Sequence, residues 1–197
     1  YIEDHYENLP DVTVFCKNSV YPRHLSEQTF ERLCKQDIFT PLVEPDRWKP
    51  SYPINYVTSV GDYLEINDSW YARGRRGRYF NDFDSFFSFL FPKACHPTFV
   101  NFTPGANFVV PKANILNRSR AFYRNLSLLI DYESHSLESF FAERALNAIF
   151  CSSYQINAAM ASDLDSEALS ALMKKNKKAA TLGRYSIAHL KRKLGFL

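Results

Sequence analysis

Residues 103–123, TPGANFVVPKANILNRSRAFY, predict a turn, a strand and a helix in quick succession. The Pro104-Gly105 pair is a turn signal, and the apolar run after it is typical of a buried strand. A second proline, Pro111, favours the first turn of a helix. Gly105 lets a ligand approach the backbone closely, and Asn107 offers a donor and an acceptor at the mouth of the strand. A tight turn in which Asn107 bonds its own backbone accounts for the same residues.

Strands and helices alternate on both sides of this stretch. Buried strands are predicted at 12–16 and 97–103, and helices over residues 1–9, 26–36, 80–91, 120–132 and from Ser136 or Ser139 onward. Prolines block long helices between residues 39 and 81, so that region is predicted to be irregular. Because strands alternate with helices, the sequence predicts an α/β fold.

The composition of the 197 residues excludes several classes of protein. Hydrophobic residues make up 46% and aromatic residues 16%, which excludes a disordered chain. The net charge of +3 is too small to indicate nucleic-acid binding by itself. The four scattered cysteines show no metal-site spacing and predict reduced, mostly buried thiols of a cytoplasmic protein. No apolar run approaches the length of about 18 residues that a membrane span needs.

The chain is predicted to contain one domain and a tail. Residues 1–160 form the α/β domain, which we expect to be N-terminally truncated because its first residues read as the end of a helix. Residues 161–197 form a charged helical tail or linker. Its lysines and arginines stand beside Leu169, Met173 and Leu190, a pattern that predicts peripheral contact with a membrane. A solvated helix explains the same pattern.

Glu143 is the candidate catalytic residue. It lies early in the predicted helix SLESFFAERALNAIF, where the helix dipole favours the ionised carboxylate. A positioned carboxylate can act as a general base and remove a proton from an attacking hydroxyl. The alternative is a glutamate that only stabilises the first turns of the helix.

Two basic segments are candidates for phosphate binding. The loop after the first strand, KNSVYPRH, contains Lys17, Arg23 and His24. The stretch RGRRGR contains four arginines, whose planar guanidinium groups suit diphosphate. These arginines are Arg73, Arg75, Arg76 and Arg78. Ordinary solvated loops are the alternative in both cases, and RNA binding is a further alternative for the arginine run.

The signal for a metal site is weak. Asp62, Glu65 and Asp68 form an acidic cluster, but their spacing is not a recognised ligand pattern. Asp82 and Asp84 stand at a predicted helix start, where N-capping explains them. The metal ligands therefore stay unknown.

Three stretches resemble small GT-A-type glycosyltransferases of fungi, bacteria and large algal viruses, a family formerly classed as a domain of unknown function. Residues 1–15, YIEDHYENLPDVTVF, are similar to the family's helix, Asn-Leu-Pro turn and strand. Residues 104–123 resemble its GA-x-F-x-V strand and R-x-x-x-FY helix, and residues 143–150, ERALNAIF, resemble its ER-x-x-x-x-IF helix. The likeness covers most of residues 1–150.

The resemblance implies a GT-A-like, Rossmann-like domain with a mixed sheet flanked by helices, which binds a nucleotide sugar. Its activity would be transfer of a hexose or deoxyhexose to a hydroxyl acceptor, a glycan or a lipid-linked acceptor, in surface glycan synthesis. Glu143 would be the base. The implied donor- and acceptor-binding residues are Lys17, Asn18, His24, Arg75, Arg76, Gly105, Ala106, Asn107 and Arg120.

One departure from the family concerns the metal. Members often carry acidic residues in a Gln-Gly-x-Pro-x-x-His type loop, whereas the loop here reads CKNSVYPRH, with Asn18, Ser19 and Arg23 in place of acids. A Mn²⁺ or Mg²⁺ ion held mainly by the donor diphosphate and a metal-free reaction are both consistent with this loop. An inactive glycan- or nucleotide-binding relative is the main alternative function, and an RNA-binding module is a further one. We expect no nucleic-acid partner and a cytoplasmic location, with or without membrane association.

Overall fold

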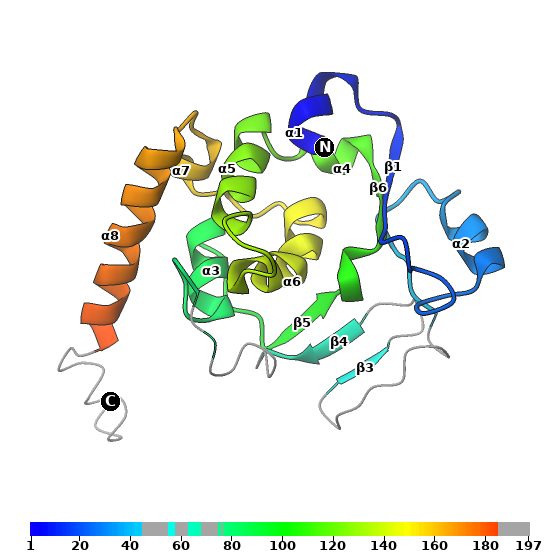
Figure 1. The fold of residues 1–197 in the computed structure, drawn as a ribbon, viewed down its shortest axis with the longest axis horizontal. Coiled ribbons are helices and arrows are strands. Elements are labelled where there is room, and N and C mark those ends of the chain that lie inside the picture. The colour runs from blue at the N-terminus through cyan, green and yellow to red at the C-terminus, as the bar shows by residue number, and fades with distance from the viewer. Residues whose placement is uncertain (45–54, 58–62, 68–74, 76, 185–197) are drawn as a thin grey trace.

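The computed structural model describes residues 1–44, 55–57, 63–67, 75 and 77–184 (Figure 1). Helices and strands alternate along these residues, which confirms a mixed α/β composition. In chain order the elements are α1 (Ile2–His5), η1 (Tyr6–Asn8), β1 (Val12–Phe15), α2 (Glu27–Leu33), β2 (Thr40–Pro41), β3 (Asn55–Val57), β4 (Tyr63–Ile66), α3 (Phe83–Leu90), β5 (Phe99–Phe102), η3 (Pro104–Ala106), β6 (Phe108–Pro111), α4 (Lys112–Leu116), α5 (Arg120–Ile130), α6 (Leu137–Cys151), α7 (Ala158–Ala161) and α8 (Ser166–Arg184).

The strand pairing differs from the expected mixed sheet, because every strand pair in the described part of the chain is antiparallel. One sheet has the order β1-β6-β2 and the other the order β3-β4-β5. A parallel pair requires a crossover that returns the chain in the same direction. Here α3 leads from β4 into β5 in the opposite direction, and β5 passes through η3 into β6 of the other sheet.

Two predictions about strands were wrong in detail. The first strand, β1, was expected to be buried, but it is an edge strand with Val14 36% exposed, whereas β6 at the centre is buried throughout. Residues 39–81 were expected to be irregular, yet they contain β2, β3 and β4. These strands are two to four residues long and carry little pattern of their own. Pairing defines them: β2 pairs with β6, β4 with β5, and β3 with β4.

The predicted helix starts are confirmed. Ser26, Asp82 and Ser136 are the N-caps of α2, α3 and α6, and each side chain accepts a backbone N–H three residues further on. Ser119 does the same for α5. Ser139 and Asp84 are thus not the capping residues, because a cap must precede the first helical residue and both lie inside their helices.

Helix α6 lies at the centre of the molecule, between α3, α5 and β5 (Figure 1). Its buried face includes Phe141, Ala145 and Ile149, which join the aromatic core. Phenylalanines of α3 pack onto the same helix, with the Phe86 and Phe141 ring centroids 5.9 Å apart. The fold therefore packs α6 against β5 and η3, and Glu143 of α6 faces the η3 turn.

The cysteines and the tail also differ from expectation. All four cysteines are free, as predicted, but Cys16, Cys95 and Cys151 are exposed because they lie at or beyond the ends of elements. In α8, Leu169 and Met173 are 2% and 0% exposed, so they pack into the core instead of presenting an apolar face to a membrane. Leu190 lies outside the described residues. None of the helices in the described part of the chain is long and apolar enough to span a membrane.

Candidate active site

Three segments that are distant in sequence meet at Gly105. The amide of Gly105 in η3 donates a hydrogen bond to Glu143 Oε1 of α6 at 2.5 Å. The backbone N–H of Lys17, just after β1, donates to Asn107 Oδ1 at 2.8 Å. The resemblance placed Lys17, Gly105, Ala106, Asn107 and Glu143 in one site, and the fold brings these five residues together.

The turn at Gly105 has a backbone that favours glycine. Gly105 has φ of 77°, and Ala106 follows with φ of 54°, in the left-handed region that costs an alanine roughly 1–2 kcal/mol. A Cβ atom added to Gly105 would lie 2.9 Å from Asn107 Nδ2 and 3.4 Å from Lys17 Nζ. The absence of a side chain at Gly105 therefore allows a lysine ammonium and an amide to approach the turn to which Glu143 is bound.

Asn107 secures the loop that carries Lys17. Its side chain is fully buried and accepts the Lys17 amide, so it holds the end of β1 beside η3. The sequence also allowed a tight turn in which Asn107 bonds its own backbone. The hydrogen bond from the Lys17 amide to Oδ1 is a different one, because this donor is 90 residues away in the sequence.

Glu143 is a largely buried carboxylic acid with a perturbed acidity. Burial raises the pKa of its carboxyl above the ordinary value. The Gly105 amide, the charge of Lys17 and the Ala106 amide each lower the pKa, but burial outweighs them. A carboxylate whose pKa is shifted toward neutrality is better suited to exchange protons with a hydroxyl group than an exposed one.

Burial, together with the charges of Arg23 and Lys17, lowers the pKa of the His24 imidazole. His24 is 4% exposed, and burial is the largest of these causes. Its backbone N–H donates to Val20, and its carbonyl accepts from Glu44. The ring is therefore neutral at pH 7 and suited to hydrogen bonding, not to charge pairing with phosphate.

We expect His24 to make the protein less stable in mild acid. Below the ordinary pKa of 6.5, the unfolded chain takes up a proton that folded His24 does not, so stability falls as pH falls. Urea titrations at several pH values between 5 and 7.5 measure this loss. The variant His24→Gln should show a flatter dependence, and His5→Gln, at an exposed position, is the matched control. An unchanged slope for His24→Gln contradicts the assignment.

Arg120 is outside the site. Its Nε donates to the carbonyl of Glu3 in α1 at 3.0 Å, and it lies at the start of α5, beyond the end of β6 that leads away from Gly105. Its neighbour Arg118 is buried and donates to the end of α6. The resemblance implied that Arg120 binds donor or acceptor, with support of helix packing as the alternative. The fold instead gives it a contact with α1, because β6 and α4 separate it from the turn.

The arginine run is only partly described. Arg73 and Arg76 lie outside the described residues. Arg75 donates to the carbonyl of His135 at 2.7 Å, and its guanidinium lies 4.7 Å from the centre of the Phe140 ring. Arg75 therefore packs over the start of α6 at Phe140, which precedes Glu143 by three residues in the sequence.

Glu138 is a functional-looking residue whose role the sequence did not reveal. It is fully buried and accepts the amides of Tyr79 and Phe80 at 2.6 and 3.0 Å, as well as the Tyr132 hydroxyl. It thus ties the segment after the arginine run to α6. Its position early in a helix gave no signal, because the two amides that it accepts are almost 60 residues away in the sequence.

The described residues show no group of three or more metal-binding side chains. Asp82 caps α3, and Asp84 accepts from Asn67 Nδ2 at 2.7 Å, so capping and packing account for both. Asn18 is exposed in the turn after β1, next to Lys17. Asp62 and Asp68 lie outside the described residues, and Glu65 is in β4. The metal ligands of any bound ion therefore remain unassigned.

His96 lies between Ser88 and Asp84, as the histidine of a hydrolase triad lies between serine and aspartate. The exposure of these side chains nevertheless indicates a structural role. His96 Nε2 is 2.5 Å from Ser88 Oγ, and Nδ1 is 3.7 Å from Asp84 Oδ2. The His96 and Asp84 side chains are 53% and 46% exposed, so water screens their attraction. A catalytic aspartate is buried and hydrogen-bonded to its histidine. We interpret the group as a tether between α3 and the connection to β5.

The chain belongs to the family described as "Protein of unknown function (DUF3431)", whose family model matches residues 1–163. This match includes every residue that meets at Gly105, and it confirms a likeness to a domain of unknown function. It assigns no glycosyltransferase activity. Searches of the curated proteins and of the solved structures found no match.

Proposed function

We propose that the chain is a GT-A-like glycosyltransferase domain that transfers a sugar from a nucleotide diphosphate donor to a hydroxyl acceptor. The observation that carries the proposal is the largely buried Glu143 carboxyl, held by the Gly105 amide beside Lys17. This arrangement supplies a positioned base and a nearby cation, which are the two groups that sugar transfer from a diphosphate uses.

In the proposed reaction Glu143 removes the proton of the acceptor hydroxyl. The oxygen forms a bond to the anomeric carbon of the donor sugar, and the bond from that carbon to the diphosphate oxygen breaks. The nucleoside diphosphate leaves with the electron pair. The exposed ammonium group of Lys17 favours the developing negative charge by its opposite charge, and solvent screening keeps this contribution modest.

The proposed donor site lies on the Lys17 side of the η3 turn. Lys17, Asn18 and neutral His24 provide one cation and hydrogen-bonding groups for a nucleotide sugar. Arg75 and Arg76 are the proposed diphosphate contacts from the arginine run. A Mn²⁺ or Mg²⁺ ion would be held mainly through the donor phosphates, and transfer without a metal is the alternative.

The alternative is a non-catalytic domain that binds a glycan or a nucleotide through the same residues. In that case Glu143 only anchors the η3 turn, and its hydrogen bond to Gly105 favours this reading as well. An RNA-binding module is a weaker alternative that rests on the arginine run alone. Membrane association through residues 161–197 stays a proposal that rests on its lysines.

Donor binding gives a direct test. At ten times the dissociation constant, a nucleoside diphosphate sugar should stabilise the protein by roughly 1.4 kcal/mol and raise Tm by roughly 3–6 °C. Thermal-shift measurements with uridine and guanosine diphosphate sugars, each with and without Mn²⁺, measure this effect. Single-stranded RNA should give no shift. Shifts with RNA and none with any nucleotide sugar contradict the proposal.

A further inference from the structure

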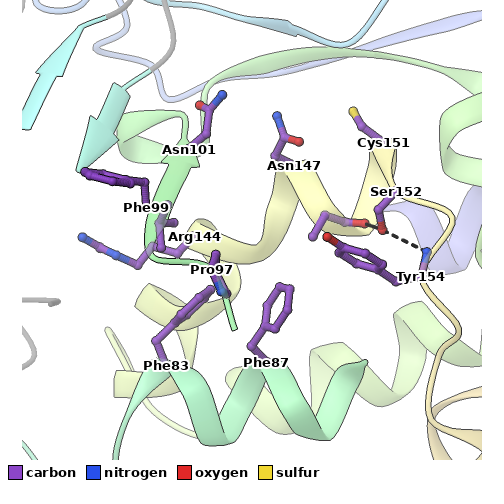
Figure 2. A pocket seen from close by; sticks show the side chains of 12 residues that line it. Phe83, Phe87, Pro97, Phe99, Asn101, Arg144, Asn147, Cys151, Ser152 and Tyr154 are labelled. Carbon is purple, nitrogen blue, oxygen red and sulfur yellow. Dashed lines mark hydrogen bonds between the residues drawn. The ribbon is translucent and has the colours of Figure 1, made fainter. Parts of the chain in front are cut away.

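A pocket of about 210 Å³ lies between α3, β5 and α6 (Figure 2). Its size corresponds to about seven water molecules and is below the roughly 300–1,000 Å³ of pockets for drug-sized ligands. It therefore suits a single ring-sized group. Among the described residues that the proposed function assigns to donor binding, none lines it; these are Lys17, Asn18, His24 and Arg75.

Two elements connect the lining of the pocket with Glu143, which does not itself line it. On α6, Asn147 lines the pocket and lies four residues after Glu143, so both are on the same side of the helix. On β5, Asn101 lines the pocket, and the strand then runs into η3, where Gly105 contacts Glu143. A ligand in the pocket can thus extend toward the carboxyl.

Aromatic rings form much of the pocket wall. Phe83 and Phe87 project from α3 toward α6 (Figure 2). Phe99 and Tyr154 also line the pocket, and they are 52% and 43% exposed. Large aromatic side chains exposed around one pocket indicate a surface that binds a partner with apolar faces.

The polar lining suits a neutral ligand with several hydroxyl groups. Asn101 and Asn147 are partly buried amides, each able to donate and accept, as paired hydroxyls require. Arg144 also lines the pocket, but its guanidinium lies 4.5 Å from the centre of the Phe102 ring, which occupies one face of the cation. A pyranose ring presents C–H groups on its faces and hydroxyl groups on its rim. The aromatic rings of the pocket suit the C–H groups, and its amides suit the hydroxyl groups.

We propose that this pocket binds a pyranose ring of the acceptor saccharide. Its role as an acceptor subsite rests on the proposed function, because only transfer gives the ligand a hydroxyl to deliver to Glu143. Binding of the ring does not depend on transfer. The donor is then bound on the Lys17 side of the η3 turn, and the acceptor on the Asn147 side.

Binding can be measured on the full chain without any donor. The probes are methyl glycosides of glucose, galactose, mannose, N-acetylglucosamine and glucuronic acid, tested by saturation-transfer NMR. At least one should bind saturably. The same glycoside should protect the exposed Cys151 thiol in the pocket from iodoacetamide, while Cys16 and Cys95 serve as internal controls in peptide mapping.

Two variants locate the binding. Asn147→Ala should weaken glycoside binding by about three- to tenfold, the usual value of one neutral hydrogen bond, and its helix should be retained because alanine favours helices. Asn176→Ala, an exposed amide of α8, is the matched control and should leave binding unchanged. No saturable binding by any glycoside, or equal binding by Asn147→Ala, overturns the proposal.

The outcome is separable from that of the proposed function. Glycoside binding and Cys151 protection together with transfer that is unaffected by Glu143→Gln would refute the catalytic proposal and leave the pocket assigned. Transfer that depends on Glu143 but shows the same acceptor KM in Asn147→Ala would refute the pocket and leave the catalytic proposal standing. If Phe99→Ala loses binding while Asn147→Ala binds as tightly as the wild type, the pocket recognises an apolar surface, and the saccharide assignment is overturned.

Discussion

Replacing Glu143 by glutamine is expected to lower sugar transfer by roughly two to four orders of magnitude, the usual contribution of a positioned general base. Glutamine keeps the shape of the side chain and an oxygen that can accept the Gly105 amide, but it cannot take up a proton. Donor affinity should therefore change little. Initial-rate measurements at saturating donor and acceptor give the change in kcat.

The stability of the same variant distinguishes a base from an anchor. Burial raises the pKa of Glu143, so the folded state binds its proton more tightly than the unfolded state. The stability of the wild type therefore falls as pH rises from the ordinary value of 4.5 through the raised value. Glu143→Gln lacks this dependence and should not melt lower at pH 7.5. Glu133→Gln, at an exposed position, is the matched control. Turnover close to that of the wild type would refute the catalytic role of Glu143.

The variant Arg118→Met is expected to lose about 3–5 kcal/mol of unfolding free energy, because several buried carbonyl groups lose a charged donor at once. Arg118 is 6% exposed, and its guanidinium donates to the last turn of α6 and the residues after it. The acceptors are the carbonyls of Ala148, Ile149, Ser152 and Tyr154 and the Ser152 hydroxyl, at 2.8–3.2 Å. Urea denaturation measures the loss.

Two further variants test the geometry of this contact. Arg118→Lys keeps the charge but not the planar fork, and we expect it to recover only part of the stability. Arg120→Met is the matched control. Arg120 lies two residues further along the chain, is exposed and donates to the carbonyl of Glu3. It should change stability by about 0.5 kcal/mol or less. Equal losses for Arg118→Met and Arg120→Met would contradict the structural role of Arg118.

The sequence by itself determined the elements that depend on neighbouring residues. Capping by Ser26, Asp82 and Ser136 starts three helices because each side chain reaches an amide three residues away. The turn at Pro104 and Gly105 follows in the same way from local backbone preferences. Motif order also indicated the family of unknown function, and the match over residues 1–163 confirms it.

Only the tertiary structure decided which of these elements meet. The antiparallel pairing of β1 with β6 joins segments almost 100 residues apart, and the bond from Gly105 to Glu143 spans 38 residues. Arg118, Arg120 and Glu138 received their roles in the same way, from partners far along the chain. Local propensity acts over a few residues, whereas these contacts depend on how the aromatic core places α6 against β5 and η3. The sequence thus predicted Glu143 as a candidate catalytic residue, and the fold of the core placed Gly105 and Lys17 beside it.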